Sequence, residues 1–139
     1  MLSVVGAQNA VFKLGGVDSL QKIIVNSDCP DTFKAMFIAC LGVCASYNTK
    51  IQIYLWKHTT NVHSCLKNYL FYSQDPEIVK QSLVALLELT VGNKKIQEQL
   101  INSDFLTMLK NVLNTSIDDG LIYAVVWTIC EIAKGGFCC

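Results

Sequence analysis

The 139-residue chain has no arginine: all eleven basic residues are lysines, and they balance eleven acidic residues. A surface that reads phosphates or bases normally uses the bidentate guanidinium of arginine, so nucleic acid is not an expected partner. Charged residues make up only 16% of the chain, against about 25% in an average domain, whereas 52% of the residues are hydrophobic. This composition excludes intrinsic disorder, and the length fits a single domain.

Long hydrophobic runs are also missing. The longest uncharged segment after the N-terminal region, residues 35–49, is too short and too polar for a membrane span, which needs about 20 apolar residues. The apolar segment 1–12 lacks the basic start and the cleavage site of a signal peptide. The seven cysteines favour free thiols in a reducing compartment, the cytoplasm or the nucleus, and the pair Cys138–Cys139 does not match a prenylation motif.

Motifs for catalysis, cofactors and metals are absent as well. The sequence has no glycine-rich phosphate loop and no nucleophile elbow, so we expect neither an enzyme nor a cofactor site. His58, His63 and Cys65 lie close together but lack the fourth ligand and the paired spacing that zinc requires, so no metal site is predicted. Cys40 and Cys44 are interpreted as packing residues on one helix face.

An internal repeat of 40–46 residues is the main positive feature of the sequence. Segments Ser27–Asn48 and Ser73–Asn93 match at Pro, Lys, Ala and Leu positions that are 46 residues apart. Asn-x-Lys-Ile-Gln and Lys-Asn landmarks then follow in the same order at spacings of 45 and 43, and a third copy starts near Ser116. The sequence therefore predicts repeats over about 6–46, 47–91 and 92–136.

Each copy indicates two short helices followed by a long one. The long helices are predicted to begin at Pro30, Pro76 and Asp119, where proline and acidic residues suit a first helical turn. Apolar residues then recur at helical spacing, and no segment shows the strict alternation of a strand. Since this period is typical of α-solenoids, in which each unit buries its apolar face against the next, the predicted fold is an all-α solenoid of about three repeats.

These residues resemble the armadillo repeat of the catenins and of importin alpha. The segment Leu14-Gly-Gly-Val-Asp-Ser-Leu20 is similar to the junction between the first two helices of that repeat. The segment Trp127-Thr-Ile-Cys-Glu-Ile-Ala-Lys-Gly-Gly136 is similar to the end of its third helix. The resemblance implies a right-handed solenoid whose third helices line a concave groove, and it implies that this groove binds an extended peptide or partner segment.

In that family a tryptophan fills the groove and an asparagine one turn later binds the peptide backbone. Counting eight residues from each predicted helix start gives the tryptophan position, and the positions one turn on either side complete a ladder. The asparagine positions hold Gly42, Glu88 and Glu131, and the two carboxylates favour Lys or Arg side chains of a ligand. The candidate partner-binding residues are Lys34, Ile38, Lys80, Val84, Glu88, Tyr123, Trp127 and Glu131.

The sequence thus predicts a non-enzymatic protein–protein interaction module. Intact arrays carry polar ends, whereas Met1–Phe12 and Ala124–Ile132 are apolar, so we expect a piece of a longer array that self-associates through its exposed terminal faces. One alternative is a purely structural solenoid segment of a larger ciliary, cytoskeletal or regulatory protein. Others are the regulatory segment of an enzyme whose catalytic residues lie outside this chain, and an array of two-helix HEAT-type repeats.

Overall fold

A computed structural model describes residues 3–26, 28–57, 61–101 and 104–135 of the chain. Every regular element in these ranges is an α-helix, so the predicted all-α class is confirmed. In chain order the helices are α1 (Val4–Lys13), α2 (Gly16–Val25), α3 (Asp31–Ala45), α4 (Thr49–Lys57), α5 (Val62–Tyr72), α6 (Pro76–Glu88), α7 (Lys94–Ile101), α8 (Phe105–Thr115) and α9 (Asp119–Gly135). Within the same ranges, none of them has both the length and the apolar character needed to cross a membrane.

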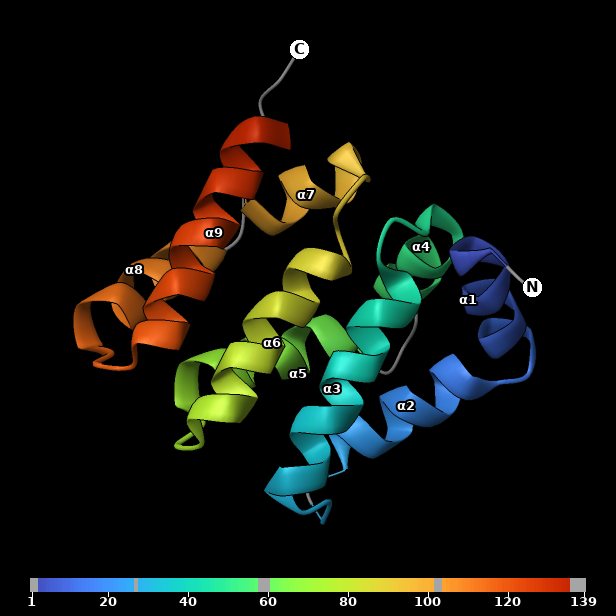
Figure 1. The fold of residues 1–139 in the computed structure, drawn as a ribbon, viewed down its shortest axis with the longest axis horizontal. Helices are drawn as coiled ribbons and strands as arrows, with labels where there is room; N and C mark the ends of the chain where they lie inside the picture. The colour runs from blue at the N-terminus through green and yellow to red at the C-terminus, as the bar shows by residue number, and fades with distance from the viewer. Residues whose placement is uncertain (1–2, 27, 58–60, 102–103, 136–139) are drawn as a thin grey trace.

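The helices follow one another in groups of two short helices and a long one, and this order recurs along the chain. The groups are α1–α3, α4–α6 and α7–α9. Each long helix packs against the short helix before it, and α3, α6 and α9 lie side by side in a row (Figure 1). The middle helices α2, α5 and α8 contact one another in the same order. The described part of the chain is therefore a repeat-like helical stack in which contacts link successive groups, an arrangement compatible with an α-solenoid.

The first helix of each group begins with a side-chain cap at the same position. Ser3, Asn48 and Asn93 lie 45 residues apart, and each side-chain oxygen accepts a hydrogen bond from the backbone N–H three residues later, at 3.0, 3.2 and 3.2 Å. Serine and asparagine are favoured here because they satisfy an N–H group that has no partner within the helix. These caps determine where α1, α4 and α7 start.

Buried glutamines join the first helix of a group to the end of its long helix. The Gln8 amide donates to the carbonyls of Val43 and Ser46 at 2.8 and 2.9 Å. The Gln52 amide donates in the same way to the carbonyls of Glu88 and Val91, at 3.2 and 2.7 Å. Carbonyls at a helix C-terminus have no partner within the helix, so a buried amide that reaches two of them fixes the helix end in place.

The starts of the long helices align α3 with α6 in a different register from the one obtained by matching their prolines. Pro76 is the first residue of α6, whereas Pro30 precedes α3 with a ψ angle of 142°, and Asp31 is the first helical residue. Because α9 begins at Asp119, the helix starts are 45 and 43 residues apart. The spacing of 46 obtained by matching the two prolines is therefore one residue too long.

One continuous cluster of buried residues runs through all the groups. Val17, Val62 and Phe105, at or next to the starts of the middle helices, are all 0% exposed. The predicted repeat boundaries near 46–47 and 91–92 fall in the loops that follow α3 and α6. The first helix starts at Val4, shortly before the predicted start at residue 6.

Candidate partner-binding surface

The long helices carry the candidate surface, because α3, α6 and α9 form a row that lies open toward the viewer in Figure 1. The residues predicted on α6 are half-buried. On α9, Tyr123 is 74% and Trp127 42% exposed, and Glu131 is half-buried. A spacing of four residues places each set along one side of its helix. We call the residues Lys80, Val84, Glu88, Tyr123, Trp127 and Glu131 the third-helix face.

Lys34 and Ile38, the ladder residues predicted on α3, do not belong to this surface. Ile38 is 0% and Lys34 6% exposed, and the Lys34 ammonium lies 4.9 Å from the centre of the Tyr69 ring. The prediction was wrong because matching Pro30 with Pro76 shifts the register by one residue, a rotation of about 100° around the helix. With the helix starts matched instead, the equivalents on α3 of Lys80, Val84 and Glu88 are Ala35, Ala39 and Val43.

Gly42 lies at a close approach of α3 to α6. A Cβ atom at Gly42 would stand 2.7 Å from Oε1 of Glu88 and 3.2 Å from the Cα atom of Ala85. The Glu88 carboxylate therefore occupies the space above this glycine, and burial raises the pKa of that carboxyl. The ion pairs between described residues are Lys67–Asp104 and Lys134–Glu131, so Glu88 is partly desolvated without a cationic partner among them.

Replacing Gly42 by Val is expected to lower the free energy of unfolding by about 2 kcal/mol, because a branched side chain would press on the α6 backbone and expel the Glu88 carboxylate. Chemical denaturation measures the change. Gly120→Val is the matched control, because Gly120 is exposed and the atoms near its added Cβ, Oδ1 of Asp118 at 3.2 Å and Nζ of Lys80 at 3.9 Å, belong to side chains rather than to the backbone of another helix. If the two variants are equally stable, the close approach at Gly42 is not a structural constraint.

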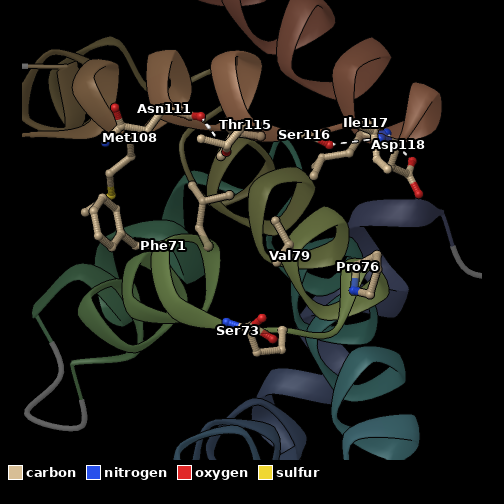
Figure 2. Close-up of a pocket in the computed structure, with 14 residues that line it drawn as sticks. Phe71, Ser73, Pro76, Val79, Met108, Asn111, Thr115, Ser116, Ile117 and Asp118 are labelled. Carbon is tan, nitrogen blue, oxygen red and sulfur yellow. Dashed lines mark hydrogen bonds between the residues drawn. The ribbon is translucent and has the colours of Figure 1, made fainter.

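A cleft that the sequence analysis did not predict lies between the α5–α6 and α8–α9 turns (Figure 2). Its volume is about 760 Å³, and Figure 2 shows Met108 of α8 extending toward Phe71 of α5. Its titratable residue, Asp118, already accepts a hydrogen bond from the Leu121 N–H at 2.9 Å, which caps α9. The cleft is thus a recess whose lining combines apolar residues with uncharged polar ones.

A second cleft, of about 580 Å³, occupies the equivalent place one group earlier. There the hydroxyl of Tyr69 donates to the Ile24 carbonyl at 2.6 Å, and Lys34 lies over the Tyr69 ring. The equivalent residues in the larger cleft are Val112 and Val79, which fill less space. The repeated Lys-Asn motif was the sequence signal from which the two clefts could have been predicted, because its asparagines, Asn68 and Asn111, line them.

The metal and thiol predictions concern residues outside this surface. His63 is buried against the Trp56 ring, with the ring centres 4.5 Å apart, and His58 lies outside the described residues. In the ranges that the structure covers, no three His, Cys, Asp or Glu side chains gather as a metal site would require. Cys40 is exposed, which the packing interpretation did not anticipate, while Cys44 is half-buried and burial raises its pKa.

Comparison of the chain with protein-family models, with curated proteins and with solved structures finds no match. The third-helix face combines two exposed aromatic residues, a partly desolvated carboxylate and a half-buried lysine along two adjacent helices. Carboxylate, ammonium and aromatic groups in this arrangement are of the kinds that contact ligands at protein interfaces.

Proposed function

We propose that the chain is a non-enzymatic protein–protein interaction module, built as a right-handed armadillo-like solenoid of about three repeats. Its third-helix face binds an extended peptide or partner segment. The row of α3, α6 and α9 supports this proposal, because it leaves the long helices open along one side (Figure 1). The free thiols of all cysteines in the described ranges are consistent with a cytoplasmic or nuclear protein.

The single observation that carries the proposal is the state of Glu88. A carboxylate that is half-buried and lacks a salt bridge among the described residues gains more from a cationic partner than an exposed one does. A Lys or Arg side chain of a bound segment would supply that partner. Trp127 and Tyr123 on the next long helix would hold the same segment, since aromatic residues are frequent anchors at interfaces.

A peptide selection tests this function. We expect random dodecapeptides displayed on phage to yield an enriched sequence that contains Lys or Arg and an apolar residue. Selection against the Glu88→Gln variant is expected to lose the preference for Lys or Arg, because the charge that recognises it is gone. If no sequence is enriched at all, the proposed peptide-binding function is wrong and the structural alternative is favoured.

Affinity measurements on the enriched peptide locate the contact. The Trp127→Ala variant is expected to bind about 30-fold more weakly, which corresponds to about 2 kcal/mol for an aromatic anchor. Adding Glu131→Lys should weaken binding further. Tyr72→Ala and Glu98→Lys are matched controls, because they alter an exposed aromatic residue and an exposed acid on other helices. Unchanged binding by the folded Trp127→Ala/Glu131→Lys variant would show that the peptide lies elsewhere.

A further inference from the structure

One side of α9 presents apolar residues to solvent. Val126 is 48% and Ile129 40% exposed, Cys130 is also exposed, and Ile122 is half-buried. No residue in this set is charged. We call the residues Ile122, Val126, Ile129 and Cys130 the leading face.

The residues at the equivalent positions of the earlier long helices are buried by the next group. The residues of α6 that lie 43 positions before the leading face are all buried, and Val79 among them lines the same cleft as Val112 and Leu121 of the following group. The residues of α3 that lie 45 positions earlier still are also buried, and Gly42 among them meets Ala85. These buried equivalents are Val79, Leu83, Leu86 and Leu87 on α6, and Lys34, Ile38, Leu41 and Gly42 on α3.

The opposite side of the stack has a matching apolar face on α3. On α6, Ala85 faces Gly42 of the preceding group, and the residues on the same side of α6 as Ala85, like their equivalents on α9, are buried. In the described part of the chain no other group packs against the equivalent residues of α3. Phe33 among them is 54% exposed, Cys40 is exposed, and Phe37 and Cys44 are half-buried. We call the residues Phe33, Phe37, Cys40 and Cys44 the trailing face. They correspond to Ile78, Ser82, Ala85 and Leu89 on α6, and to Leu121, Val125, Thr128 and Ile132 on α9.

We propose that a second copy of this chain places its trailing face on the leading face, so that copies stack head to tail. The contact would continue the interfaces that α3 makes with α6 and that α6 makes with α9 inside each copy. Because the two faces are different, the assembly is heterologous and can keep growing rather than close as a symmetric dimer. This inference is independent of peptide binding on the third-helix face.

The stacking predicts one specific pair of cysteines across the contact. Inside the chain, Gly42 of α3 faces Ala85 of α6, and a Cβ atom at Gly42 would stand 3.2 Å from the Ala85 Cα atom. In the repeat register Gly42 is equivalent to Cys130, and Ala85 is equivalent to Cys40. Cys130 of one copy would therefore face Cys40 of the next.

Disulfide trapping tests this pairing in the full chain with the other five cysteines replaced by alanine. Diamide takes up two electrons and two protons as the two thiols form a disulfide, and we expect a ladder of linked species on a non-reducing gel. The variants that also carry Cys40→Ser or Cys130→Ser are expected to remain monomeric on that gel. A strong Cys130–Cys130 dimer in the Cys40→Ser variant would overturn the proposal, because it would show that two leading faces meet.

Complementary end variants provide a second test that needs no cysteine. Phe33→Glu damages the trailing face and Val126→Glu damages the leading face, so each variant alone is expected to sediment as a monomer. An equimolar mixture retains one intact pair of faces and is expected to form a dimer but nothing larger. Leu14→Glu, which alters an exposed leucine outside both faces, should assemble like the wild type. A wild-type chain that stays monomeric at high concentration, or end variants that still assemble alone, would contradict head-to-tail stacking.

Discussion

Replacing Ile38 by Ala is expected to lower the free energy of unfolding by about 4 kcal/mol, whereas Val84→Ala should lower it by about 1 kcal/mol or less. Ile38 is 0% exposed, so its truncation loses buried apolar area and leaves a cavity between α3 and α6. Val84 is half-buried on the third-helix face, where solvent replaces the lost atoms. The difference between the two variants therefore tests the register of α3 against α6.

Chemical denaturation with a common slope for all variants gives these values. Ile53→Ala is the matched control, because it removes the same atoms from an exposed isoleucine of α4 and should cost little. Equal losses for Ile38→Ala and Val84→Ala would mean that the two positions are equivalent, as the alignment of the prolines predicts. In that case the register of 45 residues would be incorrect.

The helical class and the starts of the long helices could be predicted from local signals. Helix starts at Pro76 and Asp119 were predicted at the correct residues, because capping acids and a first-turn proline act on the backbone next to them. The start at Pro30 was one residue early, since proline is compatible both with the first helical turn and with the extended residue before it. This shift of one residue in the register of α3 was enough to assign Ile38, a core residue, to the surface.

The contacts that fix the helix ends and shape the surface could not be predicted in this way. Gln8 reaches the carbonyl of a residue 35 positions away, and nothing in its local sequence distinguishes it from a solvent-exposed glutamine. The position of the Glu88 carboxylate depends on Gly42 in another helix. The larger cleft depends on Val79 and Val112, which stand where the smaller cleft has Lys34 and Tyr69. Such features come from pairs of residues brought together by the stack, so they require the three-dimensional structure.

Acidification from pH 7 to pH 4 is expected to remove about 3 kcal/mol of stability through His63 alone. The side chain is 6% exposed and packs against Trp56, and Nε2 has no hydrogen-bond partner among the described residues. Burial, with a smaller contribution from the Lys67 charge, lowers the pKa of His63 to about 4 from the ordinary value of 6.5. Below pH 6.5 the unfolded chain therefore binds a proton that the folded chain does not take up until about pH 4, so stability falls across this interval.

The difference between wild type and a His63→Leu variant isolates this contribution. Unfolding free energies of both proteins measured between pH 7 and pH 4 are expected to diverge, with the wild type losing about 3 kcal/mol more than the variant. The raised pKa of Glu88 acts in the opposite direction, because the folded chain then binds that proton more readily, but it is present in both proteins and cancels. Parallel curves would show that His63 is protonated in the folded state near its ordinary pKa, and the packing of the α4–α5 pair around Trp56 would then need revision.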